Sequence, residues 1–537
     1  MNNSEPNRPI QRTREVVDWV IMLGAAFLVR WLFYGSRKIL EGDEIHYAES
    51  LHRFLQGRIL DGLSDYWSFF YPFSAIPFGL LSGDAETGLR LLSIFSGALL
   101  VLPCVLLARR LWGRRVAIFA GHMVALHPIL ILFSTQAMTE TFYSLLVVSS
   151  LLLLFVHMKS GTWSSLVLAG ILLGLAYQTR QEAQFFIALA LVVLLLGRGG
   201  AGIRRALKGR IQRAVVMAVI SVVLVLPYFL LLHQKTGHWT TGAKAPVTLS
   251  SRLVWEDGLE RERFVYSLND AGTARRIDEI GRESPLRILW KEKRAIASRY
   301  FKEFSQGFTH VPILLASPLL LLLVPLGLFG RKWEKENGGP ELILLLVGVF
   351  PFALYSMFQV NFRFLIPFLP VYLLWGARGC GVLCDWLREN VSNRRLVYYL
   401  ALVLVFGSLV AYTAHKYRTG EEGQAIEYKE IGMWIRANEG EGARILAHSG
   451  CPASYYAGNP EATFIPWTDL DGLMRYARHH RYSHLLVDAD YFMEARPDLA
   501  QLVGGSPVPE LEEVKTFTGR RENRIILYRL KSAPVSP

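Results

Sequence analysis

Cysteine is scarce in this chain, which has four among its 537 residues. Cys104, Cys380 and Cys384 lie in or beside apolar segments, and Cys451 stands alone near the C-terminus. This distribution shows neither a disulfide framework nor the spacing of a zinc site. The sequence therefore argues against a disulfide-stabilised domain, a structural zinc module and a redox role.

Charge is scarce as well, because only 19% of the residues are charged while 52% are hydrophobic. A soluble protein of this length usually carries more charge. The apolar residues also form long runs, such as Leu146–Phe155 and Ile313–Phe329. Since runs of about 18 to 20 apolar residues are typical of bilayer-spanning helices, we interpret the chain as an integral membrane protein.

A hydropathy window of about 19 residues predicts about eleven spans. They fall near residues 16–34, 89–108, 115–133, 139–157, 163–178, 184–198, 214–232, 311–329, 341–358, 364–386 and 396–414. Among the short loops between spans, those assigned to the cytoplasm hold the basic runs Arg109–Arg115 and Arg198–Arg213, whereas those on the other side hold little beyond Arg180 and Arg363. This asymmetry follows the positive-inside rule, so much of the net charge of +13 is explained without nucleic-acid binding.

The alternation of sides places the N-terminus in the cytoplasm and three segments outside it, namely residues 35–88, residues 233–310 and everything after about residue 415. The N-terminal arginines precede an apolar run without a small-residue cleavage site, so we expect a retained signal anchor. We expect one transmembrane domain over residues 1–415, which carries both outside loops, and a soluble extracytoplasmic domain over residues 416–537.

The C-terminal segment changes from apolar runs to alternating strands and helices. We expect strands over residues 443–448, 483–488 and 524–529, and helices over residues 424–438, 470–480 and 490–503. This alternation predicts a small α/β domain. The predicted fold class is therefore a polytopic α-helical membrane protein with a small extracytoplasmic α/β domain at its C-terminus.

Two adjacent carboxylates, Asp43 and Glu44, follow the first span on the outside. Transfer to a hydroxyl or amine needs a base that takes the acceptor proton, and a carboxylate suits that role. A carboxylate also suits a divalent metal, for which His46 is a further candidate ligand. The alternative is a pair in the first turn of a helix, where acidic residues are favoured.

Glu140 opens the fourth span on the same side. It is a candidate to share the acceptor, a metal or a proton with Asp43, so the possible metal ligands are Asp43, Glu140 and His46. The alternative is again helix capping, because Thr139 and Glu140 suit a helix N-terminus.

Two arginines stand outside the cytoplasm, where the topology does not require a cation. Arg180 lies between the fifth and sixth spans with Glu182 beside it, and Arg363 opens the tenth span. Arginine binds phosphate through its planar fork, and Glu182 is suited to orient Arg180. Lys244 is a third phosphate candidate. The alternatives are a surface pair at a turn for Arg180 and headgroup snorkelling for Arg363.

The chain resembles the GT-C superfamily of membrane glycosyltransferases. It is most similar to the bacterial branch that resembles protein O-mannosyltransferases and includes the lipid A aminoarabinose transferases. The resemblance rests on the order and spacing of several segments, namely Gly42–Glu49, Met138–Glu140, Leu173–Glu182, Tyr228–Lys244 and Arg363–Pro367. In much of that branch a proline follows the first arginine, whereas this chain has Gln181.

The resemblance implies a transferase that uses a sugar linked to polyprenyl phosphate at the extracytoplasmic face of a bacterial inner membrane. Asp43 would then be the essential carboxylate of the first outside loop and Glu140 the acidic partner of the second. Arg180 and Arg363 would contact the donor phosphate. The resemblance does not decide whether a metal takes part, and the acceptor is a glycan, a lipid or a protein.

Two other functions are alternatives to the transferase. A flippase or transporter of a lipid-linked sugar needs ionisable residues that line a path at mid-span, and the spans contain few. A non-catalytic assembly scaffold would bind without any outside carboxylate. We expect an enzyme that transfers a hexosyl or pentosyl group, inverts the anomeric centre, contacts membrane lipids and binds no nucleic acid.

Overall fold

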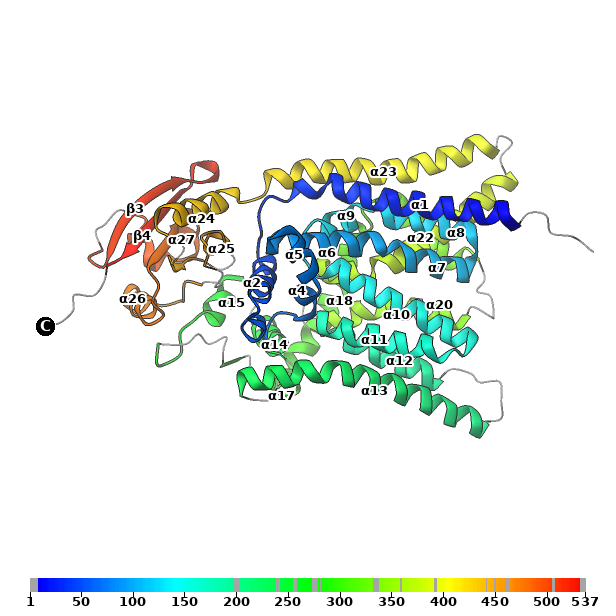
Figure 1. Ribbon diagram of the computed structural model, residues 1–537, viewed down its shortest axis with the longest axis horizontal. Helices are drawn as coiled ribbons and strands as arrows, with labels where there is room; N and C mark the ends of the chain where they lie inside the picture. Colours follow the sequence, from blue (N-terminus) through cyan, green and yellow to red (C-terminus); the bar gives the residue numbers. More distant parts are fainter. Residues whose placement is uncertain are drawn as a thin grey trace, which may run out of the picture. The chain divides into compact units, whose positions relative to one another are not determined.

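The computed structural model describes residues 8–196, 203–237, 239, 242–254, 258–272, 279–280, 282–331, 338–357, 360–390, 394–440, 442–448, 451–459, 464–504 and 508–531. Within these ranges the chain is mainly helical, with a four-stranded sheet near the C-terminus (Figure 1). The chain forms two compact units built from discontinuous segments. The first comprises Met1–Ser36, Ser68–Lys235 and Tyr300–Glu421, and the second comprises Arg37–Trp67, Thr236–Arg299 and Glu422–Pro537.

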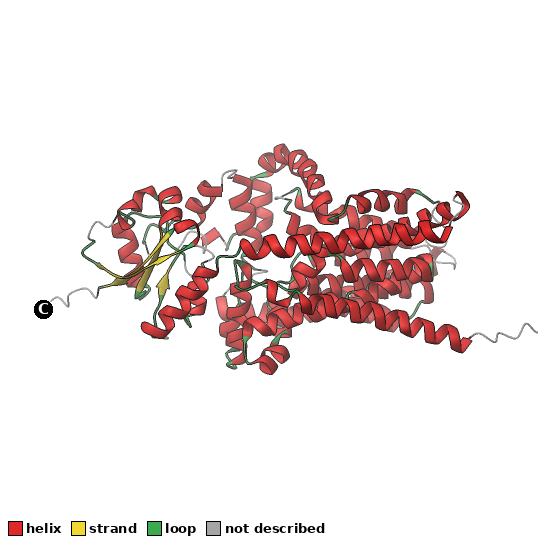
Figure 2. Cartoon of the chain, turned by 90° about the horizontal axis from the view of Figure 1, so that it is seen from above, coloured by secondary structure: helices red, strands yellow, loops and turns green. Residues whose placement is uncertain are grey.

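The first unit contains the apolar helices. Figure 2 shows that most of the described chain is helical and that the strands lie together. In the described part of the chain, five helical segments are long and apolar enough to cross a membrane: Val16–Ser36, Ala85–Trp112, Glu140–Ser160, Leu207–Thr236 and Phe362–Asn390. Two bent pairs also qualify together, Arg114–Leu126 with Pro128–Ser134 and Lys293–Leu315 with Pro318–Phe329. Four shorter apolar helices are Trp163–Thr179, Ala183–Leu196, Gly339–Tyr355 and Val403–His415. Every predicted span overlaps one of these segments, so the multi-pass prediction is confirmed. The second pair bends by 111° at its break, so the predicted span 311–329 is not one continuous helix.

The helices that position the site are α10 (Glu140–Ser160), α11 (Trp163–Thr179), α12 (Ala183–Leu196), α20 (Gly338–Tyr355), the short α21 (Phe362–Leu365) and α22 (Leu369–Asn390). Helix α10 packs along α11, and α22 packs along α19 (Pro318–Phe329). Glycines allow the second contact, because a Cβ atom on Gly327 would lie 1.9 Å from the carbonyl oxygen of Trp375. Small residues of this kind let helices in a membrane approach closely.

A buried arginine stabilises the break between α8 (Arg114–Leu126) and α9 (Pro128–Ser134). Pro128 has no backbone N–H to donate to the last turn of α8. Arg30, from α1 (Arg8–Leu32), is fully buried and donates to the carbonyl oxygens of Val124 at 3.3 Å and Ala125 at 2.9 Å. Its side chain therefore satisfies carbonyl groups at the broken end of the helix.

Charged side chains inside the first unit are more numerous than the sequence suggested, and Arg378 and Glu341 form a buried ion pair among them. The Nη1 atom of Arg378 donates to Glu341 Oε2 at 3.1 Å, and the indole N–H of Trp112 donates to Glu341 Oε1 at 3.0 Å. Glu341 is 2% exposed. Because these partners satisfy one another, the triad acts as a buried connection between helices.

The second unit combines the expected α/β domain with two earlier segments of the chain. Its sheet has the order β1-β2-β4-β3, with β1 (Ile445–Leu446) parallel to β2 (His484–Asp488) and with β4 (Arg524–Leu530) antiparallel to its neighbours. Helices α24 (Ile426–Asn438), α26 (Leu470–His479) and α27 (Ala489–Ala495) lie where helices were predicted. Strand β3 (Leu511–Thr518) was not predicted.

Contacts within the second unit join segments that the predicted topology places on one side of the membrane. The backbone N–H of Lys38 donates to Gln424 Oε1 at 2.7 Å, and the backbone N–H of Leu40 donates to the Tyr456 hydroxyl at 2.9 Å. The N–H of Ala243 donates to the carbonyl oxygen of Asp65 at 2.7 Å. Residues after the first span, after the seventh span and after the eleventh span therefore share one face, in agreement with the predicted alternation.

Candidate active site

In the first unit, two arginines converge on the carboxylate of Glu140. Glu140 is the first residue of α10, and it is fully buried. Its Oε1 atom accepts a hydrogen bond from Arg180 Nη1 at 3.2 Å and another from Arg363 Nε. Its Oε2 atom has no hydrogen-bond partner among the residues that the structure describes. The side chain of Thr139 makes no capping hydrogen bond at the start of α10. The carboxylate of Glu140 is engaged with the two arginines instead.

Arg180 is held in place from several directions. It ends α11 in an extended conformation, with φ of −151°, so its side chain leaves the helix at the start of the turn. Its Nη2 atom donates to Glu182 Oε1 at 3.2 Å, and its guanidinium carbon lies 5.8 Å from the Tyr143 ring centroid and 5.7 Å from that of Phe364. The predicted pairing of Arg180 with Glu182 is therefore present, and two aromatic rings hold the guanidinium by cation–π contact.

Arg363 reaches Glu140 from the short helix α21. The side chain of Asn361 caps this helix by accepting from the Arg363 backbone N–H at 3.0 Å. Besides its bond to Glu140, the guanidinium contacts the sulfur of Met138 at 3.7 Å. The Arg363 side chain is 25% exposed, whereas that of Arg180 is 6% exposed. One buried carboxylate thus orients two guanidinium groups, and the more exposed group lies at the edge of the cluster.

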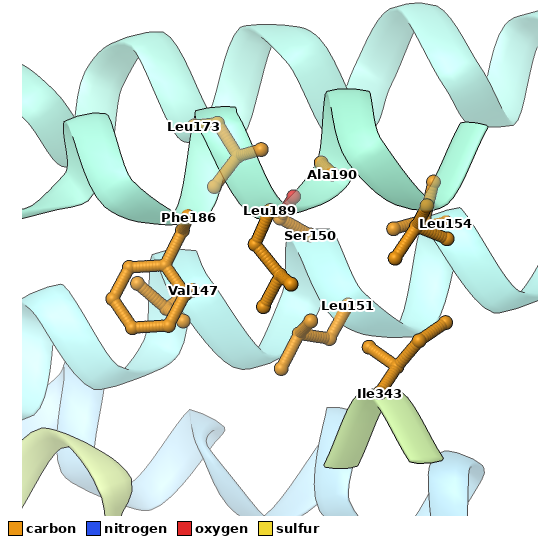
Figure 3. Close-up of a pocket in the computed structure, with 10 residues that line it drawn as sticks. Val147, Ser150, Leu151, Leu154, Leu173, Phe186, Leu189, Ala190 and Ile343 are labelled. Carbon is orange, nitrogen blue, oxygen red and sulfur yellow. The ribbon is translucent and has the colours of Figure 1, made fainter. Parts of the chain in front are cut away.

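A small apolar pocket with a volume of about 10 Å³ lies between α10, α11, α12 and α20 (Figure 3). On α10, Glu140 and Tyr143 are followed at helical spacing by Val147, Leu151 and Leu154, so all five lie on one face. The other walls come from α11, α12 and α20, through Leu173, Phe186, Leu189, Ala190, Val193 and Ile343. The hydroxyl of Ser150 donates to the carbonyl oxygen of Ala169 at 3.1 Å, so this polar group in the lining is satisfied.

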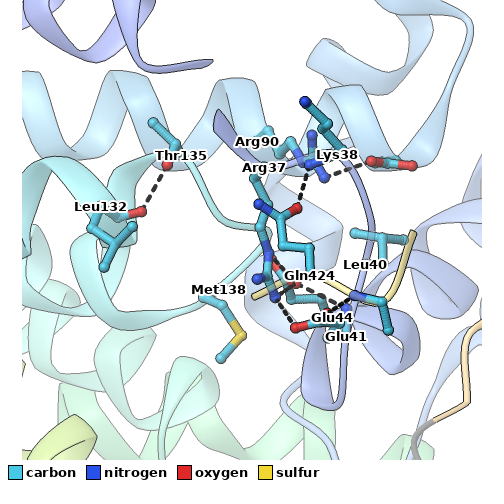
Figure 4. A network of polar contacts seen from close by, with 12 residues as sticks. Arg37, Lys38, Leu40, Glu41, Glu44, Arg90, Leu132, Thr135, Met138 and Gln424 are labelled. Atoms are coloured by element: carbon cyan, nitrogen blue, oxygen red, sulfur yellow. Dashed lines mark hydrogen bonds and ion pairs between the residues drawn. The ribbon is translucent and has the colours of Figure 1, made fainter. Parts of the chain in front are cut away.

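In the second unit, Glu44 is bound to Arg37, a residue that the sequence reasoning missed (Figure 4). Glu44 is 1% exposed, and its Oε2 atom accepts from Arg37 Nη2 at 2.9 Å and from the backbone N–H of Glu41 at 3.0 Å. Arg37 Nη2 also donates to Glu41 Oε2 at 2.9 Å. Burial lowers the pKa of Arg37, but the negative charges of Glu44 and Glu41 outweigh it and raise that pKa above its ordinary value. Glu44 therefore fixes the loop before α2.

Asp43 is the first residue of α2 (Asp43–Leu55), so both carboxylates lie in the first helical turn as the structural alternative predicted. Unlike Glu44, Asp43 is only partly buried. Gly42 precedes the helix with φ of +56°, a conformation that favours glycine. The backbone at Gly42 therefore sets the direction in which α2 begins and where the Asp43 carboxylate lies.

His46 and Lys244 both contact Trp67. The His46 ring stacks on the Trp67 ring at a centroid distance of 4.4 Å, and Lys244 Nζ lies 5.1 Å from the Trp67 centroid. Within the described residues, no three His, Cys, Asp or Glu side chains are grouped so that they could hold a metal ion. A cation at Glu140 would also face two guanidinium groups. The surroundings of Glu140 therefore do not fit a resident metal.

Tyr143 and Trp67 are further residues that the search for charged groups missed. Tyr143 is buried, and its hydroxyl has no hydrogen-bond partner in the described ranges. Its position three residues after Glu140 places both side chains on one helix face, which is a signal that the sequence contains.

Comparisons with known proteins show which sequences and folds the chain is similar to. Residues 70–230 match the sequence profile described as dolichyl-phosphate-mannose-protein mannosyltransferase. The chain is 25% identical over 371 residues to undecaprenyl phosphate-alpha-4-amino-4-deoxy-L-arabinose arabinosyl transferase 2 of Proteus mirabilis. That alignment covers 67% of this chain and 59% of the relative, so the chain spans less than two thirds of the relative's length.

The solved structure of ArnT from Cupriavidus metallidurans bound to undecaprenyl phosphate is similar, with a TM-score of 0.59 and 15% identity over 96% of this chain and 99% of that one. The chain has the GT-C fold. The oligosaccharyltransferase of Archaeoglobus fulgidus matches with a TM-score of 0.61 and 14% identity over 89% of this chain and 70% of that one. The predicted resemblance and the predicted fold class are therefore confirmed, and Glu140, Arg180 and Glu182 fall inside the matched mannosyltransferase segment.

Proposed function

We propose that this GT-C protein is a glycosyltransferase that moves a sugar from a polyprenyl-phosphate donor to an acceptor hydroxyl or amine. The observation that carries the proposal is the convergence of Arg180 and Arg363 on the buried carboxylate of Glu140. The named activity of the Proteus mirabilis relative supports it.

Arg180 and Arg363 bind the donor phosphate in this proposal. Guanidinium groups form strong, charge-assisted hydrogen bonds with phosphate oxygens, and preorganised cations stabilise the charge that develops on a leaving phosphate. Glu140 is shared by both guanidinium groups, so its role is to position them. Lys244 is a further phosphate ligand from the second unit, and Glu182 restrains the Arg180 side chain.

Asp43 is the base in this proposal. The acceptor oxygen or nitrogen forms a bond with the anomeric carbon while the bond from that carbon to the phosphate oxygen breaks. The acceptor proton passes to the Asp43 carboxylate, and the electron pair leaves with polyprenyl phosphate. A single displacement of this kind inverts the anomeric centre. Glu44 holds the preceding loop through Arg37 and so positions Asp43.

The protein is proposed to lie in the inner membrane of a bacterium, with its N-terminus in the cytoplasm and the second unit outside. The placement of lysine and arginine in the sequence supports this orientation. The acceptor is a glycan, a lipid or a protein at that face.

Reconstitution in liposomes tests the proposal against the flippase alternative. Purified protein is supplied with an undecaprenyl-phosphate sugar labelled in the sugar, together with an extract of envelope acceptors. The proposal predicts labelled product in the wild type and loss of product in a variant that carries both Arg180→Gln and Arg363→Gln. Movement of labelled donor across the bilayer without any glycosylated product would favour the flippase and contradict the proposal.

A further inference from the structure

A polar cleft in the second unit has no role in the mechanism above. One wall is the loop Ser267–Gly272, which follows α15 (Gly258–Val265), and the other is Trp467–Arg475 at the start of α26. The cleft has a volume of about 480 Å³. Sites for small ligands commonly have volumes of about 300 to 1,000 Å³.

The loop that forms the first wall is attached to the C-terminal domain. Ser267 and Trp467 form a parallel β-bridge, and the Trp467 backbone N–H donates to the carbonyl oxygen of Tyr266 at 3.1 Å. The Tyr266 ring stacks on Phe464 at a centroid distance of 4.7 Å. Leu268 packs against the hydrophobic core of the domain. The two walls are therefore parts of one folded body.

A buried arginine organises the second wall. Arg496 is 1% exposed and donates to the carbonyl oxygens of Pro466 at 3.0 Å and Thr468 at 2.7 Å. Its guanidinium carbon lies 4.7 Å from the Trp467 ring centroid, and Asp498 accepts from its Nε and Nη2 atoms. The indole of Trp467 is thus fixed from behind while it lines the cleft.

The helix start in this wall requires a glycine. A Cβ atom on Gly472 would lie 2.0 Å from the hydroxyl oxygen of Thr468. The Asp469 side chain accepts from the Gly472 backbone N–H at 2.8 Å, so it caps α26. Thr468 therefore lies close against the first turn of the helix.

The chemistry of the lining defines the ligand class. The cleft exposes mainly polar atoms, and Asn269, Asp270, Thr468 and Arg475 surround a single aromatic ring, that of Trp467. Their side chains supply both donors and acceptors. An apolar ligand would leave them unsatisfied, and one carboxylate beside one guanidinium gives no net charge for a polyanion.

We propose that this cleft is a carbohydrate-binding site that holds a hydroxyl-rich saccharide against Trp467, with Asp270 and Arg475 bonding to its hydroxyl groups. A sugar ring presents alternating hydroxyl groups that act as donors and acceptors, together with an apolar C–H face that packs on an indole. The saccharide is part of the acceptor or the growing product, and this assignment of the ligand to the reaction rests on the proposed function.

Ligand-detected NMR by saturation transfer tests the binding site on the full chain in nanodiscs. The probes are chitotriose and mannotriose, together with the polyanion trigalacturonate, which is expected not to bind. The variants are Asp270→Asn and Arg475→Gln, both at exposed positions, and the control is Arg478→Gln, an exposed residue of α26 that does not line the cleft. We expect chitotriose, mannotriose or both to bind the wild type and the control equally, and to bind each variant at least tenfold more weakly.

Two outcomes would overturn the inference, namely no binding of either chitotriose or mannotriose to the wild type, or binding that persists undiminished in both variants. The NMR experiment measures trisaccharide binding and needs neither the donor nor the transfer reaction. A failure of the proposed function is therefore distinguished from a failure of this inference. Glu140→Gln is expected to lose transfer and keep trisaccharide binding. In a transfer assay the two cleft variants should raise the KM for acceptor and leave the KM for donor unchanged.

Discussion

Arg180 and Arg363 donate to the same oxygen atom, Oε1 of Glu140, although they come from turns far apart in the sequence. Two like charges near one another repel, and the shared carboxylate offsets that repulsion. The arrangement resembles a preformed cradle for an anion, because the cations are oriented before any phosphate arrives. The predictions below follow from this geometry and from the helices that hold it.

Glu140→Gln should lower kcat/KM for transfer by about a hundredfold, because the two arginines lose the charge that positions them in the transition state. The matched control is Glu341→Gln, which removes a carboxylate from another buried ion pair of the same unit. Both variants should lose thermal stability, and only Glu140→Gln should lose transfer. Equal activity in the two variants would refute the positioning role of Glu140.

Asp43→Asn should reduce kcat by about a hundredfold or more, the scale of one positioned base. Donor binding should stay unchanged, because Asp43 is assigned to the acceptor proton. Single-turnover kinetics together with donor binding separate these effects. Turnover at the wild-type rate would remove Asp43 from the role of base.

Arg30→Met should lower the free energy of unfolding by about 2 to 4 kcal/mol, because carbonyl groups at the break between α8 and α9 lose their buried donor. Arg114→Met is the control, since it removes a partly exposed ion pair with Asp18. Exposed pairs contribute about 0 to 1 kcal/mol. Denaturation of both variants in the same detergent gives the comparison.

The second unit should lose stability on acidification. Burial lowers the pKa of His448 and of His484, so the folded state holds both rings neutral at pH values where the unfolded chain binds protons. A histidine with a lowered folded pKa stabilises the fold above its ordinary pKa, and this stability falls as pH drops below about 6.5. Protection of strands β1 and β2 against hydrogen exchange in the full chain, corrected for the intrinsic exchange rate at each pH, should therefore fall between pH 7.5 and 5.5. His448→Gln should weaken this dependence.

Properties that depend on local sequence were predicted well. Each span was recognised because a bilayer-spanning helix needs a long run of apolar residues, and such a run is visible in the local sequence. Strands β2 and β4 were recognised from short β-branched and aliphatic runs. Strand β3 was missed because it lies at the sheet edge and its exposed residues Glu512, Glu513 and Thr516 interrupt any apolar run.

Properties that depend on pairing across the fold were predicted only in part. Arg180 and Arg363 could be predicted as functional residues because a charge at a span end is energetically costly. Their shared acceptor atom could not be predicted, because it depends on the tertiary structure. Arg37 was missed because a loop brings it back onto Glu44. Arg30 was missed because the carbonyl groups that it binds are exposed by the distant Pro128.

Binding of undecaprenyl phosphate to the chain in nanodiscs, measured by native mass spectrometry, tests the central claim most directly. The single variants Arg180→Gln and Arg363→Gln should each bind the lipid at least tenfold more weakly than the wild type, and Arg114→Gln should bind like the wild type. Undiminished binding in both single variants would contradict the assignment of the Glu140 cluster as the phosphate site.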